Sequence, residues 1–308
     1  MKSFHRTMGY LMGFFFLMTL LSVVVAFSYI ERNGLSIENI FTESTSINYT
    51  DHWDIDFFPG ILSSNHRSND YETISLNESQ TFDFVDQLFI STAVEDVQFI
   101  EEDRDNILIE YSRDRPDTDR YRTKFHTQLK NNQLSVTTSL SVRNLIMTKH
   151  YEGTIKIHVP TDYHFEEIKL DSDTTRISNE NIYQNTDKLI LITDLGDIDI
   201  SINHDMDYLG VFCDLGSIDL DSTSSIKNVE VRNNLGDINV TFDAIEALDI
   251  KADLGSIDAH LNLPSDTLIY ADTDLGSVKS DFARIESRDE SNYTFYSDLG
   301  SIQVNQIN

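Results

Sequence analysis

A heptapeptide that recurs along the second half of the chain constrains the fold more than any other feature. It begins at Asp194 as Asp-Leu-Gly-Asp-Ile-Asp-Ile, and related copies follow at intervals of 20, 20, 19, 21 and 24 residues. A period near 20 with strand-like residues predicts stacked rungs, because each unit is too small to bury its apolar face alone. The glycines that share one register are Gly196, Gly216, Gly236, Gly255, Gly276 and Gly300.

Apolar residues alternate with polar ones on both sides of each glycine. Leu189, Leu191 and Leu195 keep this alternation before Gly196, and it resumes after a slip of one residue at Ile198. Period two predicts strands, and the slip predicts a corner between them. The Asx side chain at the start of the heptapeptide is expected to accept from nearby backbone, and the glycine to take a positive φ. We therefore expect an all-β fold, a parallel β-solenoid (β-helix) of about 20-residue rungs with inward leucines.

Residues 171–308 are predicted to form the regular solenoid repeats. An irregular first rung is expected near Asp173, because Thr175 stands 21 residues before Gly196 in the glycine register. Residues 72–170 keep the strand pattern without the heptapeptide, which predicts an irregular, β-rich start and cap of the solenoid. The hydrophilic run from Ser112 to Arg122 is expected to be a loop.

The chain resembles the putative-adhesin family of bacterial envelope proteins, which have β-strand repeats. The resemblance covers roughly residues 72–308 and is carried by the Leu-Gly-[Asp/Ser]-[Ile/Val] units, by Val94-Glu95-Asp96-Val97-Gln98-Phe99-Ile100 and by Ile155-Lys156-Ile157-His158-Val159-Pro160. It implies a parallel β-solenoid at the cell envelope, in some members connected with envelope stress. It implies no catalytic residue that this chain would share, and a shared fold is a weaker warrant for function than a shared site.

The N-terminal segment predicts a membrane anchor. Residues 9–30 carry no charge and are long enough to cross a bilayer, and Lys2 and Arg6 precede them. We expect a cytoplasmic N-terminus (1–8), a transmembrane helix (9–30) and an extracellular stalk (31–71), in a single-pass protein of the cell membrane. A long signal sequence cleaved near Ala26-Phe27-Ser28 is the alternative. We favour an uncleaved anchor, because the apolar stretch exceeds the usual core of a signal peptide.

The chain is strongly acidic, with 52 Asp and Glu against 23 Lys and Arg and a net charge of −29. Such a surface repels nucleic acid and anionic polymers, so no nucleic-acid partner is expected. Cations and cationic peptides are the expected electrostatic partners, beside envelope components or other proteins.

Five heptapeptide carboxylates give the sharpest site hypothesis. Stacked at about 4.8 Å, like charges repel, and Ca²⁺ would turn that repulsion into coordination. The simpler reading, which we favour, is that each Asx caps its own turn. No other cofactor is expected. The residues of this predicted calcium ladder are Asp194, Asp214, Asp253, Asp274 and Asp298.

Two function classes fit these features. One is a membrane-anchored, non-enzymatic, extracytoplasmic module for adhesion, scaffolding or cell-envelope stress sensing, with an acidic surface that binds cations or cationic peptides. The other is a β-helical carbohydrate-active enzyme acting on an envelope polysaccharide, with paired Asp residues as acid and base. Because the acids recur equivalently in every rung, whereas a catalytic pair is singular, we favour the first class and expect no enzyme. The single cysteine, Cys213, is expected to be a small packing residue.

Overall fold

The computed structural model describes residues 73–116, 121–142 and 153–307, which all lie in one compact unit, Asn69–Asn308. The predicted N-terminus (1–8), membrane span (9–30) and stalk (31–71) lie outside the described residues. Among the residues that are described, no helix is both long enough and apolar enough to span a bilayer.

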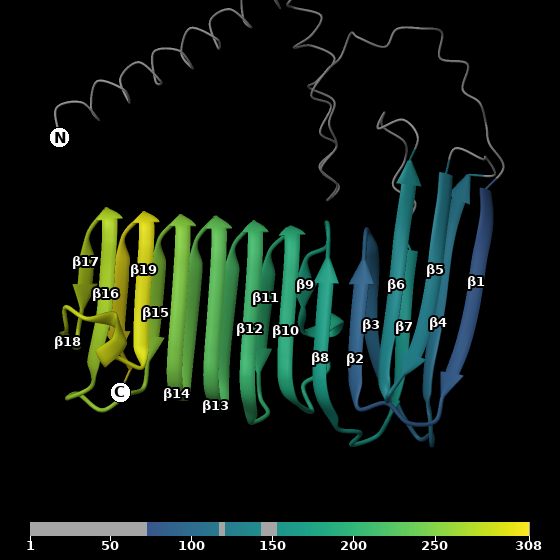
Figure 1. Cartoon of the computed structure of the whole chain (residues 1–308), viewed down its shortest axis with the longest axis horizontal. Coiled ribbons are helices and arrows are strands. Elements are labelled where there is room, and N and C mark those ends of the chain that lie inside the picture. Colours follow the sequence, from purple (N-terminus) through teal and green to yellow (C-terminus); the bar gives the residue numbers. More distant parts are fainter. Residues whose placement is uncertain (1–72, 117–120, 143–152, 308) are drawn as a thin grey trace, which may run out of the picture. The chain divides into compact units, whose positions relative to one another are not determined.

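Most of the described residues form rungs of two strands joined at a corner (Figure 1). The strands before the corner pair in parallel, so that Leu191 lies beside Val211, Val211 beside Val231 and Val231 beside Ile250. Strands before a corner are β8 (Phe165–Ser172), β10 (Thr186–Leu195), β12 (Met206–Leu215), the second parts of β13 (Ile218–Leu235) and β14 (Ile238–Leu254), β16 (Leu268–Leu275) and β19 (Tyr293–Leu299). Strands after a corner are β9 (Ile177–Ser178), β11 (Ile198–Ile202), the first parts of β13 and β14, β15 (Ile257–Leu261), β17 (Val278–Ser280) and β20 (Ile302–Gln306).

The inward ladders of the rungs form the core, as the alternation predicts. Leu189, Leu191 and Ile198 are 0% exposed, and Ile238 and Ile250 in later rungs are equally buried. Full burial of such a side chain stabilises the fold by about 1.5–3 kcal/mol. The parallel β-solenoid thus follows from a repeat whose apolar residues face one another on successive rungs.

The first region, residues 73–172, holds its strands in a different arrangement. β2 pairs in parallel with β8 and β6, and β5 closes that sheet as an antiparallel hairpin with β6. A second sheet has the order β1-β4-β7-β3, in which β4 is antiparallel to both neighbours. The strands are β1 (Thr73–Phe82), β2 (Gln87–Thr92), β3 (Glu95–Glu102), β4 (Ile107–Pro116), β5 (Tyr121–Lys130), β6 (Gln133–Val142) and β7 (Gly153–Pro160).

The prediction of a loop over Ser112–Arg122 is wrong at both ends, and residues 117–120 between them lie outside the described residues. Residues 112–116 continue β4, and β5 begins at Tyr121. The physical reason is that Arg113, only 5% exposed, forms an ion pair with the fully buried Glu95. A buried partner carboxylate lets a charged residue occupy a strand interior.

The rungs do not stack in sequence order. β19 pairs with β14 on one side and with β16 on the other (Figure 1). β20 likewise pairs with β15 and with β17. The rung of residues 293–306 is therefore inserted before the rung of residues 268–280. The segment that makes the return contains the two-residue strand β18 (Ala283–Arg284) and the short 3-10 helix η3 (Arg288–Glu290).

Candidate functional site

Each glycine of the heptapeptide lies at a corner, directly against a corner of the neighbouring rung. Gly216 has a φ of +153°, and a Cβ there would lie 2.2 Å from the carbonyl oxygen of Gly196. At Gly300 the corresponding distance to the Gly255 carbonyl is 1.9 Å. Two backbones thus approach too closely for any side chain, and this contact excludes larger residues even where φ would allow them.

The residue before the Asx points inward and, in five of the six regular rungs, fastens its corner to the neighbouring one; Ala252 holds this position in the sixth. Asn233 donates from Nδ2 to the Gly216 carbonyl at 2.8 Å, and Ser297 donates from Oγ to the Gly255 carbonyl at 3.0 Å. Asn233 also accepts the backbone N–H of Leu235 at 3.2 Å. In this rung the backbone N–H at the turn is therefore accepted by the buried residue before the Asx, and not by the Asx as expected.

Cys213 occupies this same inward column. Its Sγ donates to the Gly196 carbonyl at 3.4 Å, and burial raises the pKa of the thiol to about 11. A thiol held protonated in the core is a weak nucleophile. Its environment fits the packing role expected from the sequence.

The column of Asx side chains lies on the outside of the corners. Asp214 accepts from Asn234 Nδ2 at 2.7 Å, Asp253 pairs with Lys251 at 2.6 Å, and Asp274 accepts from the Tyr296 hydroxyl at 3.0 Å. In space the last three members follow the order of the rungs, so that Asp298 lies between the other two. Within the described part of the chain, no three His, Cys, Asp or Glu side chains converge as metal ligands. The calcium ladder of Asp194, Asp214, Asp253, Asp274 and Asp298 stays a prediction.

The outward acids after the glycine have a structural partner. Asp197 accepts the backbone N–H of Ser217, and Asp237 accepts that of Ser256, both at 2.8 Å. Each carboxylate thus ties its own corner to the following rung, which accounts for these residues without a ligand. Stacking also brings like charges close together. In the irregular rung, burial and then the Asp194 carboxylate raise the pKa of Asp173.

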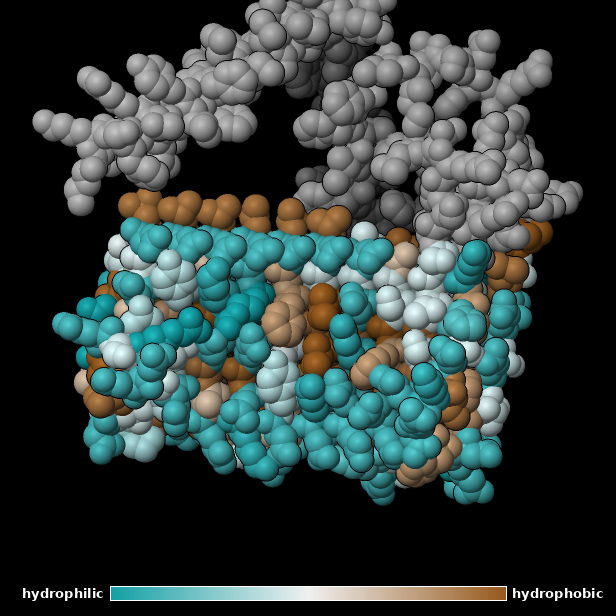
Figure 2. All heavy atoms as spheres, in the orientation of Figure 1, coloured by the Kyte–Doolittle hydropathy of each residue, from teal (hydrophilic) through white to brown (hydrophobic). Residues whose placement is uncertain are grey.

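The leucines of the heptapeptide point outward, contrary to the expected inward ladder. The strand continues through the Asx and the leucine, but both side chains are exposed, so the alternation ends at the Asx and the leucine projects from the end of the strand. The structure places one leucine on each regular rung in a single row, visible along one edge of the stack in Figure 2. We call this row the leucine ridge. Its members and their exposed fractions are Leu195 (47%), Leu215 (49%), Leu235 (48%), Leu254 (44%), Leu299 (45%) and Leu275 (69%).

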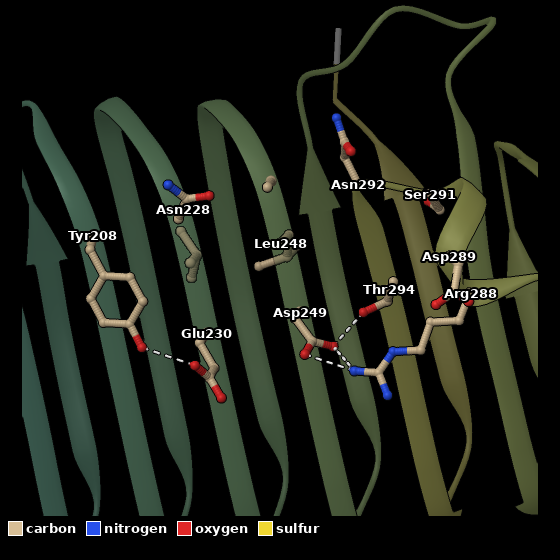
Figure 3. A pocket seen from close by; sticks show the side chains of 12 residues that line it. Tyr208, Asn228, Glu230, Leu248, Asp249, Arg288, Asp289, Ser291, Asn292 and Thr294 are labelled. Carbon is tan, nitrogen blue, oxygen red and sulfur yellow. Dashed lines mark hydrogen bonds and ion pairs between the residues drawn. The ribbon is translucent and has the colours of Figure 1, made fainter.

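A groove of about 480 Å³ lies on the face of the sheet, where the segment around η3 approaches β19 and β14 (Figure 3). Asp249 is at its centre and accepts from Thr294, from Arg232 and, at 2.8 Å, from Arg288. Burial opposes the negative charge of Asp249, but these hydrogen bonds and the two guanidinium groups outweigh it and lower the pKa of the carboxyl.

The other side of the groove is formed by Tyr208 and Glu230. The Tyr208 hydroxyl donates to Glu230 at 2.9 Å, and burial together with this carboxylate raises the pKa of the tyrosine to about 12. A general acid needs a carboxyl whose pKa is raised, whereas that of Asp249 is lowered. The groove is thus a polar recess whose charged groups largely neutralise one another.

A comparison with protein families identifies the family of the chain. Residues 85–306 match the model of the Toastrack DUF4097 family, and the chain belongs to this family. The search of curated proteins found no match.

Solved structures give more distant likenesses. A putative adhesin of Parabacteroides merdae is 13% identical with a TM-score of 0.36, and the match covers 76% of this chain and 96% of that one. A putative adhesin of Bacteroides fragilis is 13% identical with a TM-score of 0.34, covering 76% and 97%. A putative cell adhesion protein of Clostridium sporogenes is 11% identical with a TM-score of 0.31, covering 76% and 100%.

Sequence reasoning missed the leucine ridge and the groove. The signal for the ridge was present, because Thr193 and Ile198 are both inward and the intervening residues must form the corner. The signal for the groove was the 24-residue interval between Gly276 and Gly300, whose extra residues form the segment around η3. Which strands this segment would cover depended on the inserted rung, and that order has no sequence signature that we recognise.

Proposed function

We propose that the chain is a membrane-anchored, non-enzymatic adhesion module whose solenoid presents an acidic binding surface outside the cell membrane. One observation carries the proposal: outward carboxylates recur on rung after rung of a stack whose core is complete within the described residues. A surface that repeats at each rung suits binding along an extended partner, whereas catalysis needs one singular constellation.

The acidic character of the surface favours cationic partners. The carboxylates of Asp194 and Asp214 stand exposed at successive corners, and Asp199 and Asp219 repeat on the strands that follow. Charges arranged in this way attract a cationic ligand over a distance and lose that attraction as salt is added. Cationic peptides and basic regions of other envelope proteins are the partner classes that this surface fits.

Binding of a cationic polymer tests this proposal directly. The full chain, held in nanodiscs of zwitterionic lipid, is titrated with fluorescent polylysine and with fluorescent polyglutamate, and empty nanodiscs serve as the control. We expect saturable binding of polylysine that weakens at least about tenfold between 50 and 200 mM salt, and no binding of polyglutamate. Equal binding of both polymers, or of neither, would contradict the proposal.

The membrane anchor belongs to the same proposal and has its own test. Intact cells that express the chain are treated with a protease, and fragments are followed with antibodies against residues 1–8 and against the solenoid. We expect loss of the solenoid with protection of the N-terminus. Protection of both ends would place the solenoid on the other side of the membrane.

The calcium ladder is a separate part of the proposal. Support comes from the stacking of like charges, since Asp173 already shows a pKa raised by burial and by Asp194. If Ca²⁺ bridges the column, millimolar Ca²⁺ raises the melting temperature of the solenoid and a chelator reverses the rise. Identical melting curves with Ca²⁺ and with chelator would leave hydrogen bonding as the only role of these carboxylates.

The groove is the feature that best fits the carbohydrate-active alternative, since Glu230, Asp249 and Asp289 line it. Its electrostatics count against that alternative. Asp249 is held ionised by Arg232 and Arg288, and Glu230 accepts from Tyr208. Turnover of an envelope glycan that is lost on Asp249→Asn would overturn the non-enzymatic assignment.

A further inference from the structure

The leucine ridge is the most regular apolar feature on the described surface. Six of the nine large hydrophobic side chains that are exposed in the described residues belong to it. Register pairs join them directly, for example Leu195 with Leu215 and Leu254 with Leu299. Exposed apolar side chains that gather in one contiguous patch mark an interaction surface, whereas isolated ones need no explanation.

Folding does not require a leucine at this position. In the irregular rung the equivalent residue is Thr174, since the register pairs Ser172 with Thr193 and the backbone N–H of Leu195 donates to the Asp173 carbonyl at 3.0 Å. A corner of this kind can therefore be built with a polar residue. The apolar ladders that stabilise the stack lie on the inner side of the strands, and the ridge contributes little to them.

Carboxylates dominate the border on the Asx side of the ridge, and the border on the other side is polar, with two aspartates and four serines. The Asx column precedes the leucines, and Asp197 and Asp237 follow the glycines. Neither of these two columns contains a lysine or arginine between Asp194 and Ser301. In Figure 2 a band of hydrophilic residues accordingly runs beside the hydrophobic row.

This border decides which occupant fits. Anionic lipid headgroups are repelled by it, and a second copy of the chain would bring the same acidic border against its own. A partner with an apolar stripe flanked by lysine or arginine satisfies both the ridge and its border. Charge complementarity of this kind also excludes wrong partners, because like charges across an interface cost several kcal/mol.

The spacing of the ridge selects the conformation of that partner. Rungs repeat at about 4.8 Å, so six leucines span about 24 Å. An α-helix returns an apolar side chain to one face about every 5.4 Å, so it drifts by about 3 Å over the five steps of the ridge. An extended strand returns one about every 6.8 Å and drifts by about 10 Å. A helix of about 16 residues therefore matches the ridge in both length and period.

We propose that the leucine ridge, with its acidic border, is the docking site for a single cationic amphipathic helix. The proposal rests on the function proposed above, because it names the partner class for the same acidic surface. The helix lies along the stack, with its apolar stripe on the leucines and its basic residues over the flanking carboxylates. This is the helix-in-groove mode of recognition with an inverted shape, since the protein supplies the ridge and the helix supplies the holes between its side chains.

The probe for the test is a fluorescent 18-residue peptide of leucine and lysine with its leucines on one helical face. A peptide of the same composition, with leucines spread around the helix, is the control ligand. The full chain in nanodiscs of zwitterionic lipid is titrated by fluorescence anisotropy, with empty nanodiscs subtracted. We expect the amphipathic peptide to bind at least about tenfold more tightly than the control peptide. Equal affinities would overturn the proposal.

Two ridge variants separate the apolar and the electrostatic contributions. Leu215→Ser, Leu235→Ser and Leu254→Ser combined should weaken peptide binding at least about tenfold, because the centre of an interface carries most of its affinity. Asp214→Asn, Asp253→Asn and Asp298→Asn combined should weaken binding and flatten its salt dependence. The matched control is Leu129→Ser with Leu268→Ser, which removes leucines that are 43% and 51% exposed outside the ridge and should leave binding unchanged. Melting curves of all variants must coincide with that of the unmodified chain.

The outcomes distinguish failure of this inference from failure of the proposed function. If the serine variant binds as tightly as the unmodified chain while the asparagine variant does not, the acidic surface remains the binding surface and the ridge is not the site. If the amphipathic peptide fails to bind while polylysine does, the same conclusion holds. Self-association, or binding to phosphatidylcholine vesicles, that is lost in the serine variant would replace the helix with a second copy or a membrane as the occupant.

Discussion

The first region (residues 73–172) and the regular rungs (residues 186–306) reach the same stacked core by different means. In the rungs, backbone lies on backbone at the corners, and hydrogen bonds from inward side chains such as Asn233 fasten one carbonyl to the next rung. In the first region, antiparallel pairing of β4 with β1 and β7 takes the place of repeated corners. Contacts between individual side chains hold these strands together. The two charged residues that are buried among the described ones, Glu95 and Arg113, both lie there.

This difference shows where each region is sensitive to mutation. The rungs tolerate changes on their outer side, because outer residues vary from Asp to Ser at equivalent positions, but their corners tolerate no added atom. The first region depends on one network in which Glu95 accepts from Arg113, from Thr138 at 2.5 Å and from two backbone amides. The following predictions test that contrast.

The largest expected effect comes from a single methyl group at a corner. Gly236 has a φ of +142°, and a Cβ there would lie 2.0 Å from the Gly216 carbonyl oxygen. Gly236→Ala should lower the free energy of unfolding by about 4 kcal/mol, combining backbone strain with overpacking. Urea denaturation followed by circular dichroism measures it. The control is Thr175→Gly at the irregular rung, which should change stability by less than about 1 kcal/mol. If Gly236→Ala also cost less than about 1 kcal/mol, neighbouring rungs would be able to move apart at the corner.

The buried ion pair should come next. Glu95→Gln leaves the Arg113 guanidinium buried without a counter-charge and should cost about 3 kcal/mol. Adding Arg113→Met removes the stranded charge, so the double variant should recover at least half of that loss. Denaturation curves of the two single variants and the double variant measure this coupling. Strictly additive losses would mean that the two residues do not act as a pair.

Loss of a hydrogen bond that fastens one corner to the next should lower the stability less. Asn233→Ala removes the donor to the Gly216 carbonyl and should cost about 1 kcal/mol, since Ala252 holds the same column position in the next rung. Asn234→Ala changes the exposed neighbour, which donates only to Asp214, and should cost less than about 0.5 kcal/mol. A reversed order of the two losses would return the capping role to the Asx of the heptapeptide.

The smallest expected effect is a gain in stability where the two regions meet. Burial and the Asp194 carboxylate raise the pKa of Asp173 above its ordinary value of 3.8, so the folded state disfavours its charge at neutral pH. Asp173→Asn should therefore stabilise the fold at pH 7 by about 0.5 kcal/mol or less after solvent screening. The gain should vanish as the pH falls below 3.8, where the unmodified side chain is protonated in both states. Thermal melts across this pH range measure it, and a gain that persists at pH 3 would point to a cause other than charge.

The rungs could be predicted from sequence because their determinants are local and repeated. Alternation correctly placed Leu189, Leu191 and Ile198 on the inward side, and the glycine marked the corner. The prediction that Leu195 points inward was wrong, because the period-two pattern ends before the corner. Local pattern therefore fixes the strands better than it fixes the residues between them.

The first region and the order of the last rungs were out of reach for the same physical reason. Both depend on contacts between residues far apart in sequence, such as Glu95 with Arg113 and Leu254 with Leu299. A hydrophilic run around Arg113 indicates a loop unless its distant partner is known. The groove around Asp249 follows from the inserted rung, so it could not be predicted before that order.

The inserted rung has a consequence for how the solenoid is completed as the chain emerges in sequence order. Until residues 293–306 are available, the partner that β16 has in the finished stack, β19, does not yet exist, and β18 pairs with only two of its residues. The segment 268–280 must therefore stay unpaired with the stack until then, or pair first with β14 and later be displaced by β19. Completion of this end of the solenoid is thus a late step in biogenesis, and the unpaired edge strand is open to proteases and chaperones until then.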